Sequence, residues 1–90
     1  TKESYNTKYL VVPTNAGLIK KAIEISTIIR EKSPCEVDLM RRKLGKALSY
    51  ADAEGIPFVV IVGKEELKND RVLLKNMKSG EQKEVSVKDL

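Results

Sequence analysis

Four cations stand close together in the middle of the chain, between residues 38 and 46. Arg41, Arg42 and Lys43 follow one another, and Lys46 comes three residues later. Where a strand leads into a helix, such cations and the N–H groups of the first helical turn form a corner that binds phosphate. A solvent-exposed basic turn explains the same residues equally well. The segment therefore predicts a phosphate-binding corner or a solvated turn, and the residues alone leave both open.

Gly45 lies within this basic segment, at a position where we expect a helix. Glycine inside a helix costs about 1 kcal/mol relative to alanine. A close approach of another backbone is the usual compensation. We expect Gly45 to pack closely against the sheet, and close approach of a ligand is the alternative.

Other chemistry is limited by residues that the chain lacks. It has no histidine and a single cysteine, Cys35, so it can form neither a Ser–His or Cys–His nucleophile pair nor a Cys/His zinc site. No G-x-G-x-x-G or P-loop motif occurs, so we expect no dinucleotide or P-loop nucleotide site. Glu65 and Glu66 are neighbours, but nothing in their spacing makes them a catalytic pair. We expect Cys35 to be a small strand residue, and this chain to hold no catalytic site, metal or cofactor.

The elements that position the cations alternate between short apolar runs and amphipathic segments. The pattern predicts strands over residues 8–13, 34–39, 56–62, 71–75 and 82–87, helices over 16–32 and 44–54, and a short helical turn over 64–68. The run 56–62 is apolar throughout, which is typical of a central strand covered on both faces. This order predicts an α/β fold with a mixed, mainly parallel sheet and helices on its faces. Ligands of such sheets bind outside the carboxyl ends of the strands.

The helix ends and buried stripes can also be predicted. We expect the side chain of Asn15 to cap the first helix and Gly55 to end the second in the left-handed conformation. The expected buried positions are Leu18, Ala22, Ile25 and Ile29, widened by Ile19 and Ile23, in the first helix, and Leu44, Ala47, Leu48 and Ala51 in the second.

The length of 90 residues predicts one domain, over residues 8–90, after a frayed or linker N-terminus over residues 1–7. The net charge of +4 permits contact with nucleic acid without requiring it. No run approaches the roughly 20 apolar residues of a membrane span, so we expect no membrane contact. The lone cysteine and the absence of a signal peptide favour a cytoplasmic location. We interpret the chain as an excised piece of a longer protein.

Four segments carry a resemblance to a known family. Residues 9–13 form an opening strand, residues 38–52 follow the pattern D-L-x-x-R-K-L-G-K-x-x-x-Y-A-D, residues 59–67 follow V-V-I-x-G-x-x-E-L, and residues 72–82 follow V-x-x-K-D-[LM]-x-[ST]-G-E-Q. Over residues 8–90 the chain resembles the C-terminal anticodon-binding domain of class II aminoacyl-tRNA synthetases of the histidyl, threonyl, prolyl and glycyl group. The last segment favours the histidyl branch. Asn76 stands where that pattern has aspartate, and Met40 and Arg41 stand where many bacterial members have small residues.

The resemblance implies a three-layer α/β/α fold, with a five-stranded mixed sheet between helices and one antiparallel strand. It also implies a parent enzyme, a homodimeric histidine–tRNA ligase that uses ATP and Mg²⁺. The catalytic domain would lie upstream in the same chain. This fragment would not be an enzyme itself but would hold the anticodon stem-loop of histidine tRNA and help to select that tRNA.

By position in the related domains, Arg41, Glu66 and Lys75 would meet anticodon bases. Arg42, Lys43 and Lys46 would contact the tRNA backbone. Lys75 would lie away from the other strand ends if its strand is the antiparallel one.

Two alternatives remain open. The chain could be a synthetase-like regulatory or protein-interaction domain of the kinase or polymerase-accessory type, without tRNA selection, or an unrelated α/β domain for a small ligand. The basic segment and the turn over residues 79–82 favour the anticodon-binding function.

Overall fold

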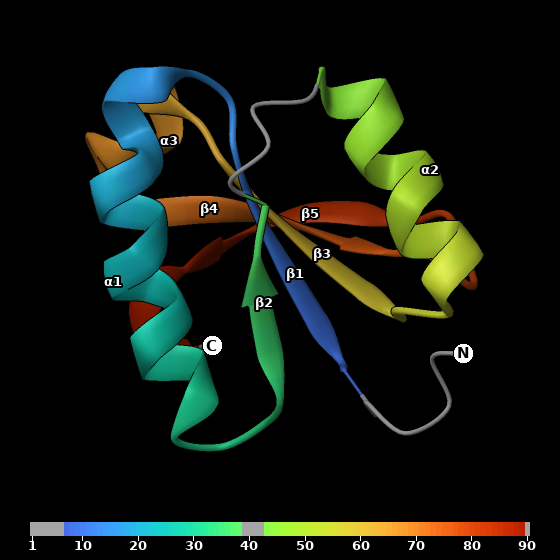
Figure 1. Cartoon of the computed structure of the whole chain (residues 1–90). Coiled ribbons are helices and arrows are strands. Elements are labelled where there is room, and N and C mark those ends of the chain that lie inside the picture. The colour runs from blue at the N-terminus through green and yellow to red at the C-terminus, as the bar shows by residue number, and fades with distance from the viewer. Residues whose placement is uncertain (1–6, 39–42, 90) are drawn as a thin grey trace.

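The computed structural model describes residues 7–38 and 43–89, apart from the side chain of Glu66. Along this part of the chain, strands and helices alternate as expected (Figure 1). The elements are β1 (Tyr9–Pro13), a 3₁₀ turn (Ala16–Leu18), α1 (Ile19–Arg30), β2 (Cys35–Val37), α2 (Leu44–Glu54), β3 (Phe58–Val62), α3 (Lys64–Leu67), β4 (Arg71–Asn76), β5 (Gln82–Ser86) and a second 3₁₀ turn (Val87–Asp89).

The five strands form one mixed sheet in the order β2-β1-β3-β4-β5. β1 pairs in parallel with β2 and β3, whereas β4 runs antiparallel to β3 and β5. The expected single antiparallel strand is therefore β4, and the other four strands point in one direction. β3 occupies the centre of the sheet, as its continuous apolar run predicts, and its last four residues are buried.

The sheet is covered by α1 on one face and by α2 on the other, as Figure 1 shows. Because successive side chains of a strand point to opposite faces, β1 divides its residues between two cores. Val11 packs with Ile25 and Ile29 of α1, and Leu10 and Val12 pack with the alanines of α2. The predicted three-layer α/β/α architecture is confirmed.

Two residues expected in the buried stripes are exposed. Ile23 is 45% exposed and Leu44 is 38% exposed. In a helix, residue 23 lies about 200° around the axis from Ile25, beyond the face that the sheet covers. Ser26 is buried in place of Ile23. Its hydroxyl donates to the Ile23 carbonyl at 2.7 Å, so the buried polar group has a hydrogen-bond partner. Leu44 is the first residue of α2, one turn before the buried Ala47.

The two helix ends differ in how well they were predicted. Gly55 ends α2 with φ 75°, as expected for a left-handed C-cap. The side chain of Asn15 makes no capping bond, so its predicted role as a side-chain cap is wrong. The chain enters α1 through a 3₁₀ turn instead, in which the Leu18 N–H donates to the Asn15 carbonyl at 3.0 Å. A 3₁₀ start satisfies one of the first N–H groups without any side chain.

Cys35 opens β2 and is buried with its thiol free, as its interpretation as a small strand residue predicts. Burial raises the pKa of the thiol from 9.0 to about 11, because the thiolate would lose its hydration. The nearby Arg30 charge lowers this pKa, and Glu36 raises it. The thiol is thus protonated at neutral pH, which suits a core residue and not a nucleophile.

The turn between β4 and β5 is held by its own side chains. Oδ1 of Asn76 accepts the N–H groups of Lys78 at 2.9 Å and Ser79 at 3.2 Å, and the Ser79 hydroxyl oxygen accepts the Glu81 N–H at 3.2 Å. Gly80 has φ 79°, where glycine is favoured. An aspartate at position 76 would offer an equivalent acceptor oxygen. The asparagine that departs from the family pattern therefore has a local role in this turn.

We predict that Cys35 makes stability depend on pH in the alkaline range. A folded-state pKa raised above the unfolded value contributes stability that is present below pH 9 and lost as pH rises toward about 11. The loss is at most about 1.4 kcal/mol per pH unit. Urea unfolding of the wild type and of Cys35→Ala at pH 8, 9 and 10 measures it, because every other side chain is common to both proteins. A stability difference that stays constant over this range would contradict the prediction.

We also predict that Asn76→Ala destabilises the fold by about 1 kcal/mol, because two turn N–H groups lose their acceptor. Asn76→Asp keeps an acceptor oxygen and should stay within roughly 0.5 kcal/mol of the wild type. Chemical denaturation of the three proteins compares them. Equal losses in both variants would show that the amide itself, and not the acceptor oxygen, is required.

Candidate nucleic-acid interface

The ends of three strands and the starts of three helices meet along one edge of the sheet, at the top of Figure 1. This carboxyl edge is formed by Thr14 after β1, Asp38 after β2, Lys43 before α2, and Gly63 and Lys64 after β3. Thr14 is fixed there because its N–H and its hydroxyl both donate to the Val62 carbonyl, at 3.1 and 3.0 Å.

A crevice is expected between β1 and β2, because the chain leaves these neighbouring strands toward opposite faces of the sheet. After β1 it enters α1 on one face, and after β2 it enters α2 on the other. Such a switch point is the usual ligand site of an open α/β sheet. Asp38 marks the β2 side of it, with 6% exposure and an N–H that donates to the Val11 carbonyl at 2.8 Å.

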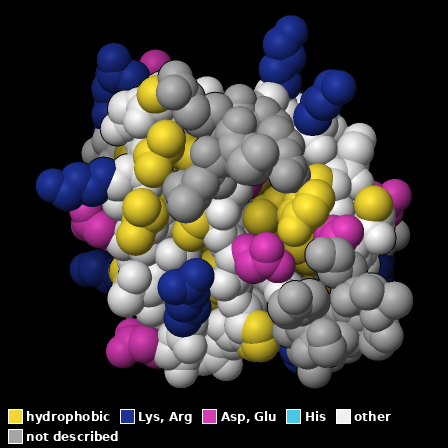
Figure 2. Space-filling view, in the orientation of Figure 1, with side chains coloured by type: hydrophobic (Ala, Val, Ile, Leu, Met, Phe, Trp, Pro, Cys, Tyr) yellow, Lys and Arg dark blue, Asp and Glu magenta, His cyan; other side chains and the backbone are white. Residues whose placement is uncertain are grey.

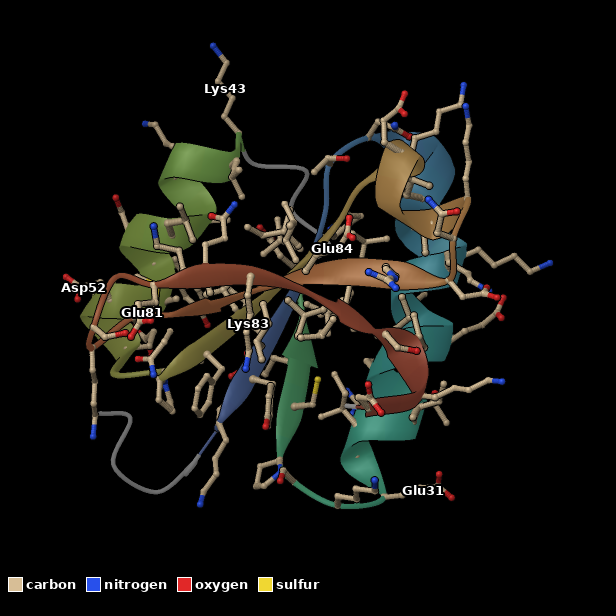
Figure 3. The ribbon with its side chains drawn as sticks, turned by 180° about the vertical axis from the view of Figure 1, so that it is seen from behind. Glu31, Lys43, Asp52, Glu81, Lys83 and Glu84 are labelled. Carbon is tan, nitrogen blue, oxygen red and sulfur yellow. The ribbon has the colours of Figure 1, made fainter. Side chains whose placement is uncertain are left out.

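The start of α2 borders this switch point and carries described cations of the basic segment. Lys43 is the N-cap residue, with extended backbone (φ −64°, ψ 151°), and Lys46 lies in the first turn; both are exposed. Lys43 points away from the body of the protein in Figure 3. No acidic residue stands in the first turn of α2, and Lys43 makes no side-chain capping bond. The positive end of the helix dipole thus coincides with two cations.

Gly45 does not pack against the sheet, so that expectation is wrong. The residue is exposed, and a Cβ built at this position would meet no described atom within 4 Å. Its φ lies outside the left-handed range that favours glycine. Neither packing nor backbone conformation within the described residues therefore requires a glycine here, between Lys43 and Lys46.

The other predicted contact residues are distributed unevenly. Arg41 and Arg42 lie outside the described residues. Glu66 belongs to α3, which follows β3 at the carboxyl edge, but its side chain is likewise outside the description. Lys75 pairs with Val59 near the start of β3 and with Gln82 at the start of β5. It therefore lies toward the opposite edge of the sheet, as its antiparallel strand implies, on the face that carries α2.

Sequence reasoning missed cations contributed by α1. Lys20 is exposed in the first turn of α1, which also lacks acidic residues. The ammonium of Lys21 beside it forms an ion pair with Glu24, with 3.9 Å between Nζ and Oε1. Lys64 is exposed at the start of α3. Figure 2 shows basic side chains projecting along the upper rim over both α1 and α2. The crossover order was the available signal, since it brings these helix starts to one edge.

Within the described ranges, no group of three or more acidic, cysteine or histidine side chains is placed to hold a metal ion. No described helix is long and apolar enough to cross a membrane. What the carboxyl edge offers is positive charge, helix starts and, at Gly45, a Cβ position with no described atom within 4 Å. This combination suits a phosphate-bearing ligand.

Comparison with known proteins identifies the fold and the family. A family model described as an anticodon binding domain matches residues 8–90. The histidine–tRNA ligase of Methanococcus maripaludis is 41% identical over 91 residues, which cover 98% of this chain and 22% of that protein. The enzyme of Thermococcus kodakarensis is 49% identical over 67 residues, 73% of this chain and 15% of that protein. The chain spans about a fifth of the length of the curated relatives it matches.

Solved structures agree with this relationship. The histidyl-tRNA synthetase of Nostoc superposes with a TM-score of 0.91 and 32% identity, over 94% of this chain and 21% of that chain. The RNA binding domain of threonyl-tRNA synthetase from Cryptosporidium parvum gives a TM-score of 0.85 at 12% identity, over 93% of this chain and 22% of that one, which shows a shared fold alone. The chain belongs to the family of anticodon-binding domains found in histidyl-tRNA synthetases.

Proposed function

We propose that this domain binds the anticodon stem-loop of histidine tRNA at the carboxyl edge, within a larger histidine–tRNA ligase. One observation carries the location: two exposed lysines, Lys43 and Lys46, flank Gly45, whose Cβ position meets no described atom, at the start of α2 beside the switch point between β1 and β2. Family membership and the histidyl relatives support the identity of the RNA.

The energetics of α2 support a ligand with negative charge. Cations near a helix start oppose the macrodipole, typically by about 0.3–1 kcal/mol each, and a glycine in a helix costs roughly 0.5–1 kcal/mol. The start of α2 therefore combines three residues that do not favour its stability. A phosphate bound at this helix start is attracted both by the lysines and by the positive end of the helix dipole. The missing Cβ of Gly45 lets the RNA backbone approach the N–H groups of the first turn.

Contacts to bases would come from the residues matched by resemblance. Arg41 and Glu66 fit this role chemically, because an arginine donates to guanine O6 and N7 and a glutamate accepts from base amino or imino groups. Arg42 would join Lys43 and Lys46 on the phosphates. Lys75 would take part only if the RNA also crossed the α2-bearing face of β4.

The rest of the enzyme would supply the chemistry. A histidine–tRNA ligase needs ATP and Mg²⁺ to activate histidine, and we assign both to a catalytic domain elsewhere in the parent protein, which we propose to be a cytoplasmic homodimer. The part proposed for this domain is to position one tRNA and to add discrimination through its anticodon. That part requires binding groups and no reactive side chain.

We predict that the chain binds the histidine-tRNA anticodon stem-loop with strong salt dependence. Lys43→Ala and Lys46→Ala should each weaken binding roughly three- to ten-fold, the equivalent of about 0.7–1.4 kcal/mol. Each should also reduce the slope of log K against log salt by about 0.7–0.9, because one phosphate contact is lost. Fluorescence anisotropy titrations at several salt concentrations measure both quantities.

Lys83→Ala is the matched control, since Lys83 is an exposed lysine of β5, away from the start of α2 (Figure 3). It removes the same charge from the protein and should change affinity less than two-fold at moderate salt, because salt screens interactions between exposed charges that are far apart. Equal losses in all three variants would mean that general positive charge, and not the carboxyl edge, binds the RNA.

Gly45→Ala should separate stability from binding. The alanine raises helix propensity and meets no described atom, so the free energy of unfolding should rise by roughly 0.5–1 kcal/mol. Its methyl group would stand between α2 and the RNA backbone, so affinity for the stem-loop should fall roughly three-fold or more. Urea unfolding and anisotropy on the same preparation give both values. A more stable variant with unchanged affinity would remove Gly45 from the interface.

A further inference from the structure

Glu36, at the centre of the edge strand β2, connects three segments that are distant in sequence. Its Oε2 accepts the hydroxyl of Thr7, just before β1, at 2.9 Å. Its Oε1 accepts the hydroxyl of Tyr50, in the second turn of α2, at 3.4 Å. This second bond is long for a hydroxyl donor. One carboxylate therefore ties the middle of α2 to the edge of the sheet.

The core by itself holds α2 less firmly than α1. α2 fully buries Ala47 and Ala51, whereas α1 buries Ile25 and Ile29 as well as smaller residues. Alanines allow a close approach to the sheet, but they bury little apolar area and offer no long side chain to interlock with neighbours. Leu48 and the ring of Tyr50 add partly buried contacts with the same core. The fully buried apolar anchor of α2 is nevertheless smaller than that of α1, and the hydrogen bond from Tyr50 to Glu36 supplements it.

Tyr50 lies on the same stripe of α2 as the proposed phosphate contacts. Lys46 is four residues before it and Lys43 seven, so all three fall within about 60° around the helix axis. Any rotation that separated Tyr50 from Glu36 would turn Lys46 by the same angle. The direction of the two lysines at the carboxyl edge is thereby linked to a hydrogen bond about one turn from Lys46 and two turns from Lys43.

We infer that Glu36 is a positioning residue for nucleic-acid binding, which acts through Tyr50 to fix the rotation of α2 and the direction of Lys46. This inference rests on the proposed function. Glu36 itself need not touch the RNA. Its role is to remove alternative orientations of α2 before binding, so that less ordering is required in the complex.

Tyr50→Phe tests the inference because it removes the donor hydroxyl and keeps the ring. It should weaken binding of the histidine-tRNA anticodon stem-loop about as much as Lys46→Ala, roughly three- to ten-fold, and reduce the salt slope similarly. Combined with Lys46→Ala, it should add less than two-fold, since both changes disable the same contact. Glu36→Ala should behave like Tyr50→Phe, and Glu36→Gln, which keeps an acceptor oxygen, should recover most of the loss.

Thr27→Ala is the matched control, because it removes an equivalent bond from an exposed helical hydroxyl, that of Thr27 to the Ile23 carbonyl at 3.0 Å, in α1. It should leave the salt slope unchanged. If Lys46→Ala weakens binding while Tyr50→Phe does not, or if the two changes multiply fully in the double variant, the positioning role is wrong although the interface stands. If the wild type does not bind the stem-loop, both the proposed function and this inference fail.

Discussion

Two neighbouring strands at the centre of the sheet are closed to water on both faces, and the rest of the structure depends on this burial. Leu10, Val11 and Val12 of β1, with Val59 to Val62 of β3, send side chains alternately into two cores. Each core needs a covering helix, so the chain must cross one face between β1 and β2 and the other face between β2 and β3. Parallel strands joined by such crossovers have all their exits at one edge.

The chemistry of that edge follows from the same constraint. Helices that start where strands end point their N–H groups and positive dipole ends to one side of the molecule. Lysines of α1, α2 and α3 add full charges there. The two helices nevertheless differ, because the fully buried side chains include isoleucines in α1 but only alanines in α2, beside which Leu48 and Tyr50 are partly buried. The helix that we propose to contact RNA is thus the one with the smaller apolar anchor, which gives the Glu36–Tyr50 contact its importance.

Elements with a strong local signal could be predicted from sequence. The apolar run of β3 indicated its central place, and the glycine at position 55 indicated the end of α2. Positions that depend on tertiary geometry could not be predicted from the sequence. Ser26 is buried where Ile23 was expected, because the direction of a side chain around the helix counted for more than its hydrophobicity. The first N–H groups of α1 were satisfied by a 3₁₀ turn instead of the Asn15 side chain.

The candidate site was predicted in part for similar reasons. The cations at residues 43 and 46 formed a visible local cluster, and their helix start was placed correctly. Lys20 was missed, because only the crossover order brings α1 to the same edge. The open surroundings of Gly45 and the contact between Glu36 and Tyr50 depend on pairs far apart in the chain. Residue spacing carries no information about such pairs until the strand order is known.

An NMR titration of the ¹⁵N-labelled chain with the anticodon stem-loop of histidine tRNA tests the central claim most directly. Amide shifts report which backbone groups change environment on binding. We expect the largest changes along the carboxyl edge, at Thr14, Asp38, Lys43 to Ala47, and Lys64. Changes concentrated instead in the turn between β4 and β5, or at the carboxyl ends of α1 and α2, would contradict it.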